Sequence, residues 1–530
     1  MEGVIDLETS TCALSQGNLH HLEDGTAFLL EGTVESHNEL EPAVLNGSFR
    51  IFIQQPRSRR IYIAVDRLAS RPLLYRIEGA RIRFASTLSA FPSPHPLNTA
   101  AFAAMLSSGF LYGDDTWIDG VRWLPGGTML LVEDRSWRIE RYWDYKLLPD
   151  EETDEPALRS RLAELLITAV ERRTRRCPNL GLLLSGGYDS RAILGCCMRL
   201  GRKVTCLSWS AVERGGDDLS VARELSRRAG VSFRQLSYEP IEIREAITKT
   251  VAPFDGMRYP IQEANAFVSL RNVVTHILVG DEAFGWNATP ISSEDESLYT
   301  VGIRRLRRQA CWQKFLQPRL RDSLCAASDA SLARLYTKTA HIPDLHDKKD
   351  YLYVTERLPR NVLPGRLFLD KYAEVLNPWL DNDIMDFVAR LPRRHRLGKA
   401  LFRATVRQTF PELFAVPMAN TRLSIERFLP TTPGARTEEL FLWSAMYSAL
   451  HSEPSLEARL VRAVFSIQNE MGRPAARAVY SFLAKISGVA TATRLGALDC
   501  LDAIVRAELV LFMVENLSLN PGPDLSAFLS

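Results

Sequence analysis

The stretch 180–191, LGLLLSGGYDSR, stops an apolar run at Ser-Gly-Gly and continues, after an acid and a hydroxyl, with a helical pattern. The two glycines lack Cβ atoms, so the backbone can turn sharply and direct successive N–H groups at a ligand. The helix that follows adds the positive end of its dipole, and this combination binds phosphate oxygens. Ser185 and Ser190 can donate hydroxyl hydrogen bonds, and Asp189 suits an anion site if Mg²⁺ lies between them. The segment predicts a site for metal-bound phosphate.

A simple strand-to-helix turn would also use glycine for its geometry and Ser or Asp as a helix cap. The string S-G-G-x-D-S directly after an apolar strand is much more restrictive than an isolated glycine pair. No Lys-Ser/Thr follows the glycines, which excludes a Walker loop. Leu183 stands where the nucleophile elbow G-x-S-x-G requires glycine, which excludes that motif as well.

Strands and helices alternate around this segment. Apolar runs and helical spacing predict strands over 180–185, 203–209, 231–236 and 276–280, and helices over 157–173, 191–200 and 218–230. Such alternation predicts parallel β-α units in an open sheet. The ligand crevice of such a sheet lies at the carboxyl ends of its strands, near the topological switch point. Beyond residue 300 we expect a mostly helical chain.

The part before this sheet has a different pattern. Residues 25–90 alternate apolar and polar side chains in short runs, which predicts half-buried antiparallel strands. Acids replace hydrophobic residues over 147–156, as expected of an exposed linker. We therefore expect three parts, over 1–150, over 151–430, and as a helical extension packed on the second part over 431–530. The apolar stretch 494–516 is interpreted as a core or subunit-contact helix, which allows a homodimer.

Composition excludes several classes of protein. The 530 residues are 46% hydrophobic and 24% charged, as in soluble globular proteins of two or three units. A net charge of +2 provides no field for a nucleic acid. Eight cysteines without a C-x-x-C pair indicate reduced thiols and no zinc site. The sequence shows no signal peptide and no membrane-spanning run, so we expect a cytoplasmic protein that binds neither nucleic acid nor a membrane.

The S-G-G-x-D-S string resembles the pyrophosphate loop of N-type ATP pyrophosphatases, which cleave ATP between its α and β phosphates. Within that group the chain resembles the asparagine synthetase family. ILVGDEAFGW at 277–286 is similar to the family's strand followed by Asp-Glu-x-Phe-Gly. AEVLNPWLDNDIMDFVARLP and GKALFRATVRQTFPEL follow in the family's order, and the resemblance covers roughly residues 40–430.

The resemblance implies ATP and Mg²⁺ as cofactors. It implies Asp189, Asp281 and Glu282 as metal ligands, with Asp218 at the acid of the family's acid-led helix. The expected nucleotide-binding residues are Leu184, Ser185, Gly186, Gly187, Asp189, Ser190, Ser208 and Gly280.

The resemblance also implies catalytic residues. Glu374 matches the family's acid beside the acyl-adenylate, where it would take the proton of the attacking amine, with a tyrosine such as Tyr351 or Tyr353. Lys399 matches the lysine of the family's Lys-x-x-x-Arg helix and is the third predicted catalytic residue. Each acid has a plainer explanation as a helix cap or an ion-pair partner, but together they follow the family's order along the chain.

The first part resembles the family's glutaminase domain without its nucleophile. That domain has an exposed Cys after the initiator Met; here position 2 is Glu, and we expect the usual Cys-Gly-Ile strand to be missing. A carboxylate cannot replace a thiolate nucleophile. Cys12 is interpreted as a small buried thiol. Arg67 and Arg71 are then expected to hold the domain together without binding glutamine.

The second part departs from the family at two places. Leu376 stands where the family usually has Arg, and FPELFAVPMAN at 410–420 has no basic residue where the family has an R-x-K pair. Arg422 is the nearest substitute. Either the charge on pyrophosphate is neutralised differently, or a basic group comes from another segment.

The expected fold is a degenerate Ntn-hydrolase-like α+β sandwich, then a doubly wound α/β ATP-pyrophosphatase domain with a helical C-terminal part. The expected reaction adenylates a carboxylate, releases pyrophosphate and lets an amine attack without glutamine hydrolysis. The amine is ammonia or an amino group of the same substrate. Intramolecular closure resembles the reactions of β-lactam synthetases and of lasso peptide macrolactam cyclases, of which we favour the second.

Alternatives of other kinds stay open. An ammonia-dependent asparagine synthetase-like enzyme fits the same motifs. ATP pyrophosphatases that modify tRNA usually show reactive cysteine pairs and basic surfaces, and neither is visible. The fold could also serve as an inactive partner-binding module of a biosynthetic assembly. The expected partners are a small molecule or peptide with a carboxylate and an amine, and other biosynthetic proteins.

Overall fold

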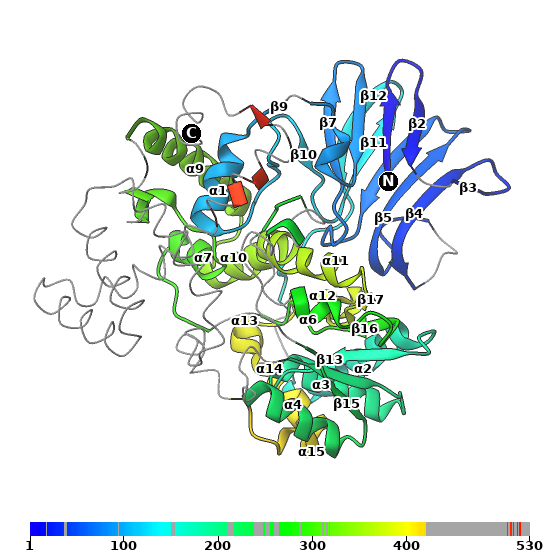
Figure 1. Ribbon diagram of the computed structural model, residues 1–530, viewed down its shortest axis with the longest axis vertical. Coiled ribbons are helices and arrows are strands. Elements are labelled where there is room, and N and C mark those ends of the chain that lie inside the picture. Colours follow the sequence, from blue (N-terminus) through cyan, green and yellow to red (C-terminus); the bar gives the residue numbers. More distant parts are fainter. Residues whose placement is uncertain are drawn as a thin grey trace, which may run out of the picture.

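The computed structural model of the protein combines two antiparallel sheets, a parallel sheet and surrounding helices (Figure 1). The residues it describes are 1–16, 19–35, 40–93, 95–149, 154–209, 217–237, 247–249, 255–258, 264–285, 288–309, 312–313, 316, 318–419 and several between 506 and 520. The calls on Arg422 and on most of 431–530 therefore lie outside the described residues.

The first part is a sandwich of two antiparallel sheets. One has the order β10-β7-β8-β1-β2 and the other β12-β11-β6-β5-β4-β3. The strands of the first sheet are β1 (Glu2–Asp6), β2 (Thr11–Gln16), β7 (Leu74–Glu78), β8 (Arg81–Ala85) and β10 (Arg122–Trp123). Those of the second are β3 (His20–His21), β4 (Ala27–Val34), β5 (Gly47–Gln55), β6 (Arg60–Val65), β11 (Thr128–Glu133) and β12 (Ser136–Arg141). Phe52 and Phe84 stack between the sheets with ring centroids 6.0 Å apart.

The expectation that the start of the chain lacks a strand is wrong. Glu2–Asp6 forms β1, which pairs with β8 on one side and β2 on the other. Gly3 and Ile5 are its buried residues. A strand of five residues with acids at both ends and glycine on its buried face gives almost no alternation signal, so partners on both sides determine its structure.

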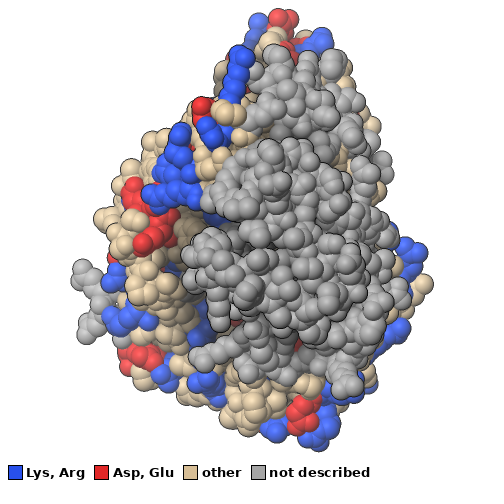
Figure 2. Space-filling model, turned by 60° about the vertical axis from the view of Figure 1, so that its left-hand side comes forward, with Lys and Arg blue, Asp and Glu red and all other residues tan. Residues whose placement is uncertain are grey.

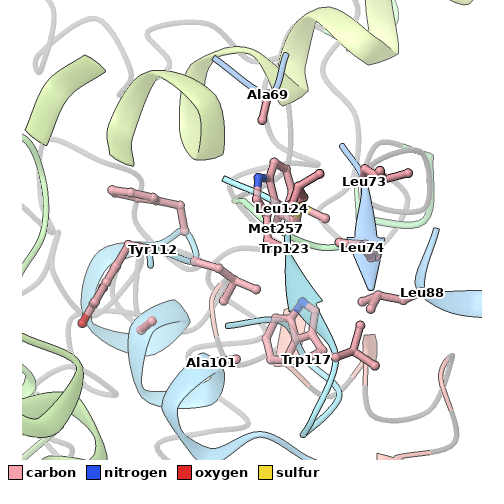
Figure 3. Packing of buried hydrophobic residues seen from close by; sticks show 14 of the residues in the cluster. Ala69, Leu73, Leu74, Leu88, Ala101, Tyr112, Trp117, Trp123, Leu124 and Met257 are labelled. Atoms are coloured by element: carbon pink, nitrogen blue, oxygen red, sulfur yellow. The ribbon is translucent and has the colours of Figure 1, made fainter. Parts of the chain in front are cut away.

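The largest hydrophobic cluster crosses the predicted boundary at 150. Helix α1 (Thr99–Ser108) packs against α9 (Pro318–Thr339) of the second part. Trp117 and Trp123 are fully buried between them and the first sheet, with Met257 packed in the same group (Figure 3). The two parts therefore share one hydrophobic cluster.

The described residues of the C-terminal extension lie against both parts of the chain, since a Cβ added to Gly256 of the second part would lie 2.4 Å from Sδ of Met513. Leu509, Val510 and Met513 are buried in the cluster that contains α1. Arg506 donates to the carbonyl oxygens of Leu106 and Ser107 at 2.9 Å each, near the end of α1. Helix ends leave carbonyl groups without partners, and a buried guanidinium satisfies them. β18 (Leu519–Asn520) also pairs with β9 (His95–Pro96) of the first part.

The second part contains the expected parallel sheet. Its order is β15-β14-β13-β16-β17, and each neighbouring pair is parallel. The strands are β13 (Leu180–Leu183), β14 (Thr205–Ser208), β15 (Ser232–Gln235), β16 (His276–Leu278) and β17 (Glu374–Leu376). The strand order reverses between β13 and β16, which makes this pair the topological switch point. The sequence prediction is confirmed for the four strands it named.

Helices cover both faces of this sheet. One hydrophobic cluster joins it to α2 (Glu155–Thr174), α3 (Tyr188–Arg199), α4 (Asp217–Arg228), α12 (Asn382–Ala389) and α14 (Ala400–Thr409). Another cluster joins its other face to α6 (Ala264–Val268) and α11 (Pro364–Leu369). Asp154 caps α2 by accepting a hydrogen bond from the Ala157 N–H, so the acidic linker also begins the helix.

Most of the described chain beyond residue 300 is helical, as expected. The remaining helices include α7 (Glu294–Thr300), α10 (Leu345–Leu352), the π-helix η4 (Tyr353–Val362), α13 (Arg393–Arg396) and α15 (Pro411–Phe414). Among the described residues, none of the helices has the length and apolar character needed to cross a membrane. In Figure 2, acidic and basic side chains lie next to one another over the described surface.

The packing of α14 on the parallel sheet can be tested at an aromatic pair between them. Phe402 is 1% exposed and stacks on Phe284 with ring centroids 4.2 Å apart. We expect Phe402→Ala to lower the free energy of unfolding by about 3–5 kcal/mol, because it leaves a cavity, and Phe402→Leu to cost less. Urea denaturation followed by tryptophan fluorescence measures the change, since Trp379 packs against the same ring. Equal stability of Phe402→Ala and the unchanged protein would contradict this packing.

Candidate active site

The Ser-Gly-Gly loop connects β13 to α3 at the carboxyl edge of the parallel sheet. The Ser185 N–H donates to Ser190 Oγ at 3.1 Å, which folds the loop back onto the first turn of α3. The Gly187 N–H donates to Ser185 Oγ at 3.2 Å, and the Gly186 N–H donates to Asp218 Oδ1 at 2.8 Å. Asp218 therefore orients the loop through its backbone.

Glycine at position 186 has a packing reason in addition to the expected ligand reason. An added Cβ there would lie 2.4 Å from the Cβ of Ala419. The fully buried Arg191 guanidinium holds this neighbouring segment, because it donates to Gly186 O at 2.9 Å and to Val416 O at 2.7 Å. The segment around 416–419, which has no basic residue of its own, is thus fixed over the loop by an arginine from α3.

The structure brings the first loop together with the Asp-Glu segment after β16. A Cβ added to Gly280 would lie 3.2 Å from the backbone carbon of Asp189, so the two loops touch. The Trp379 indole N–H donates to Asp189 O at 3.1 Å and fixes the start of α3 from a third segment. These loops follow β13 and β16, the two strands at the switch point. Leu184 and Ser208, at the ends of β13 and β14, are buried at the same edge.

Lys399 joins the acids of the two loops. Its Nζ lies 2.9 Å from Asp189 Oδ2, 3.0 Å from Asp189 Oδ1 and 2.8 Å from Glu282 Oε1. Burial raises the pKa of Asp189 and the ammonium of Lys399 lowers it, while the carboxylates of Glu282 and Asp281 raise it further. The same two acids, Glu282 and Asp189, raise the pKa of Lys399 against the effect of its burial. The three groups form one buried electrostatic unit.

Asp281 is held by two residues that the sequence did not indicate. Arg366 donates to it twice, from Nε at 2.7 Å and from Nη2 at 2.6 Å, and the Asn377 amide donates at 3.1 Å. Arg366 comes from α11, and Asn377 directly follows β17. Leu376 replaces the family's Arg, so the sequence predicts either a different neutralisation of charge or a basic group from another segment, and Arg366 is a basic residue of another segment beside Asp281. Nothing in its local sequence marks it.

Lys399 reaches the acids from a strained turn. Both Gly398 and Lys399 have φ of 59°, in the left-handed region that side chains other than glycine rarely adopt. The Lys399 N–H donates to Gly285 O at 3.1 Å, and the preceding Arg396 is fully buried between Asp347 and Asp350. A strained backbone conformation persists where the surrounding contacts hold it in place, and such residues are typical of functional sites.

Of the two tyrosines considered, Tyr353 lies near the acids and Tyr351 does not. The Tyr351 hydroxyl donates to Asp144 Oδ1 at 3.2 Å, and burial and Asp144 raise its pKa. Burial raises the pKa of Tyr353 most, and Glu282 and Asp281 raise it further. Residues two apart in a helix point in nearly opposite directions, so only one of the pair can face the site. Tyr353 also begins the π-helix, a feature common at functional sites.

The structure does not bring Glu374 to the two loops. Glu374 begins β17 and is in register with His276, which pairs with Leu180 at the amino end of β13. Its Oε1 accepts a hydrogen bond from the Thr33 hydroxyl at 2.6 Å. The Ser-Gly-Gly loop lies at the other end of these strands, so the strand direction separates Glu374 from the predicted partners of its chemistry.

A cavity of about 70 Å³ lies between the two parts of the chain, beside Asn377. Arg67 and Arg71 line it from the first part, and Arg366 and Asn377 line it from the second. Within the described ranges, Arg67 Nε, Arg71 Nε and Asn377 Oδ1 are buried without a hydrogen-bond partner. Arg67 pairs with Asp386 at 2.6 Å and Arg71 with Asp370 at 2.9 Å, so both arginines tie the two parts together.

The acids fit a divalent cation in part. Carboxylate oxygens are the ligands that Mg²⁺ prefers, and those of Asp189 and Glu282 converge on one point, where the Lys399 ammonium lies. Asp281 uses both oxygens on Arg366. No group of three His, Cys, Asp or Glu side chains in the described part of the chain is arranged to hold a metal. Asp189 and Glu282 are the residues that would hold Mg²⁺ in this arrangement, and Asp281, the third predicted ligand, is held by Arg366.

Family models and one curated relative match this chain. The asparagine synthase family model matches residues 161–283, and the glutamine amidotransferase domain model matches residues 29–143. Asparagine synthetase [glutamine-hydrolyzing] 1 of Bacillus subtilis (strain 168) is 22% identical over 281 residues. These matches support membership of the asparagine synthetase family. The alignment covers 51% of this chain and 44% of the relative, less than half of the relative's length. The glutamine amidotransferase match lies within the first part of the chain and the asparagine synthase match within the second.

Solved structures give weaker similarities. NMN synthetase from Francisella tularensis is 11% identical, with 42% of this chain and 93% of that chain covered and a TM-score of 0.18. Glutamine phosphoribosylpyrophosphate amidotransferase from B. subtilis is 13% identical, with 43% and 65% covered and a TM-score of 0.17. TM-scores this low do not show a shared fold. The support for the asparagine synthetase family therefore comes from the two family models and the curated relative.

The site makes a direct prediction about nucleotide binding. We expect Asp189→Ala to weaken the binding of Mg²⁺·ATP at least tenfold, because it removes one of two converging carboxylates. Isothermal titration calorimetry measures the affinity. The matched control is Asp322→Ala, whose carboxylate is 71% exposed on α9 and should leave the affinity unchanged. Equal affinity of both variants would remove Asp189 from the site.

Proposed function

We propose that this member of the asparagine synthetase family is an ATP-dependent carbon–nitrogen ligase. It adenylates a carboxylate of its substrate, releases pyrophosphate, and lets an amine displace AMP to form an amide. One observation carries the proposal: at the carboxyl edge of the parallel sheet, Lys399 joins Asp189 of the phosphate loop to Glu282 of the next loop. A site of this charge pattern suits a metal-bound triphosphate.

The residues around the loops match the charges of this reaction. Pyrophosphate leaves with negative charge, and a preorganised cation stabilises it most in a buried site. Lys399 and Arg366 are the two cations beside the acids, with side chains 14% and 29% exposed. Mg²⁺, held by Asp189 and Glu282, would add further positive charge at the departing oxygen. Arg366 thereby takes over the neutralising role that the family's Arg has at position 376.

The interface cavity is the proposed place for the organic substrate. It adjoins Asn377, which donates to Asp281 and leaves its carbonyl oxygen unpartnered among the described groups. Arg67 and Arg71 line the same space, and their Nε–H groups are buried without a partner among the described residues. Unpartnered buried donors and acceptors cost free energy unless a ligand or water satisfies them. A substrate with a carboxylate and an amine supplies both kinds of group.

Several features support amide formation without glutamine hydrolysis. Glu2 in β1 accepts a hydrogen bond from the Ser15 hydroxyl at 3.1 Å and is no nucleophile. Cys12 is the sole cysteine before residue 177, and burial raises the pKa of its thiol to about 12. A thiol that is almost fully protonated does not attack an amide. Arg67 and Arg71 are engaged with acids of the second part.

The position beside the attacking amine is assigned to Tyr353 in place of Glu374, where the phenol, kept protonated by its raised pKa, orients the amine while the proton passes to solvent. Tyr353 is 8% exposed, and the charges of all three acids raise its pKa. Glu374, in contrast, begins β17 at the far edge of the sheet. A general base must lie within hydrogen-bond reach of the proton it takes. In this proposal Glu374 has a structural role at the interface, through its contacts with Thr33 and His276.

With no ammonia source in the proposed reaction, the amine comes from the substrate itself. Intramolecular attack benefits from very high effective concentration. We therefore propose ring closure in a small molecule or peptide, such as macrolactam formation of a lasso peptide, in the cytoplasm. β-Lactam synthetase-like closure and ammonia-dependent amidation of a free acid use the same site and are the alternatives. An inactive partner-binding module is opposed by the intact ionic unit around Lys399, which serves no purpose in such a module.

Pyrophosphate release tests the proposed reaction. The protein is incubated with ATP, Mg²⁺ and candidate peptides or amino acids, with ammonium added in parallel reactions. We expect substrate-dependent release of pyrophosphate and AMP, and a product lighter than the substrate by one water when the ring closes. Product formation that requires ammonium would favour the amidating alternative. Absence of pyrophosphate with every carboxylate tested would favour the partner-binding module.

Glutamine independence has its own test at Cys12. We expect Cys12→Ala to leave pyrophosphate release unchanged, and native Cys12 to react with iodoacetamide at pH 8 roughly 10³-fold more slowly than a free cysteine, because of its raised pKa. Mass spectrometry of the labelled peptide measures the rate, with urea-unfolded protein as the control. Glutamate released from glutamine, and lost in Cys12→Ala, would show that a working glutaminase is present.

A further inference from the structure

The Lys399 ammonium lies at the point on which two carboxylate groups converge. Three of their oxygens lie within 3.0 Å of Nζ, so the ammonium occupies the position between the two carboxylates. The side chain of Glu282 is 5% exposed, that of Lys399 14% and that of Asp189 29%. The unit is therefore closed on the Glu282 side and accessible from the Asp189 side.

The charges around this point explain what the ammonium does. Asp189, Glu282 and Asp281 are three carboxylates, and Lys399 and Arg366 are two cations, so the group has a net charge of −1. A free divalent cation entering it would leave a charge of +1 beside two existing cations. Without Lys399 the group would have a charge of −2, which one divalent cation neutralises. Close charges in a buried site interact strongly, so this difference controls metal affinity.

We propose that Lys399 is a built-in counter-ion that keeps metal alone out of the acid pair, so that the metal enters only together with the nucleotide. This inference rests on the proposed function in that it takes metal-bound ATP as the ligand. The triphosphate brings negative charge with the metal, which removes the excess positive charge and gives the displaced ammonium a new partner.

The backbone supports a fixed position for this ammonium. Lys399 adopts a φ of 59° directly after Gly398 with the same φ, and its N–H bonds to Gly285 O at 3.1 Å. Arg396, three residues earlier, anchors the segment by donating to Leu391 O at 3.1 Å, to Asp347 and to the buried Asp350. A lysine on a flexible loop would not need this geometry. The turn places the ammonium at the acids before any ligand binds.

Binding of Mn²⁺ alone, followed by electron paramagnetic resonance, tests the inference without any enzyme turnover. The variants are Lys399→Met, which removes the charge and keeps the stem, and Lys399→Arg, which keeps a cation. Lys203→Met is the matched control, since Lys203 is exposed before β14. We expect Lys399→Met to bind Mn²⁺ without nucleotide at least tenfold more tightly than the unchanged protein. The Arg variant and the control should bind it as weakly as the unchanged protein.

A second measurement, of the melting temperature, applies if Lys399→Met lowers the stability of the protein. Lys399→Met leaves two acids without their counter-ion, so its melting temperature should fall, and Mg²⁺ without ATP should restore it while leaving the unchanged protein unaffected. Equal Mn²⁺ affinity of Lys399→Met and the unchanged protein, or no recovery with Mg²⁺, overturns the inference. If the unchanged protein binds Mn²⁺·ATP in that experiment, the proposed function survives. Failure of the unchanged protein to bind Mn²⁺·ATP would instead contradict the proposed function.

Discussion

A single ion-paired unit holds the proposed active site together. Lys399, on the turn before α14, contacts Asp189 after β13 and Glu282 after β16. These segments are separated by roughly a hundred residues along the chain, and only the parallel sheet with its switch point between β13 and β16 brings them to one edge. Removing one member of a buried charged group leaves the others uncompensated, so the position of each segment depends on the other two.

The first part of the chain contributes to this site through the interface. Arg67 and Arg71 each pair with an acid of the second part, and the cavity between the parts ends beside Asn377, which bonds Asp281. The first part, which matches a glutamine amidotransferase domain model, has a physical role at the proposed site because its arginines complete the wall of the proposed substrate cavity. This explains why the domain retains a packed core shared with α9.

The sequence predicted what is local and periodic. The apolar runs identified β13, β14, β15 and β16, and the S-G-G-x-D-S string located the turn between β13 and α3. It missed β1, whose acids and glycine hide its alternation, and the packing of Arg506 on α1, which depends on contacts between distant segments. In the site, the sequence correctly predicted that the acids of the two loops lie close together, but the prediction also included Glu374. A motif gives the order of residues along the chain and does not show at which end of a strand a side chain lies. Arg366 and Asn377 had no signal, since their importance comes only from their contact with Asp281.

A crystal structure with Mn²⁺ and an ATP analogue that has a methylene bridge between its α and β phosphorus atoms tests the central claim most directly. Anomalous scattering locates the metal, and the analogue blocks the proposed cleavage. The account predicts a manganese peak bound by Asp189 and Glu282, a triphosphate at the Ser185–Ser190 hydroxyls, and Lys399 moved from its position between the acids. Metal and nucleotide found elsewhere, with Lys399 still bridging the two carboxylates, would contradict it.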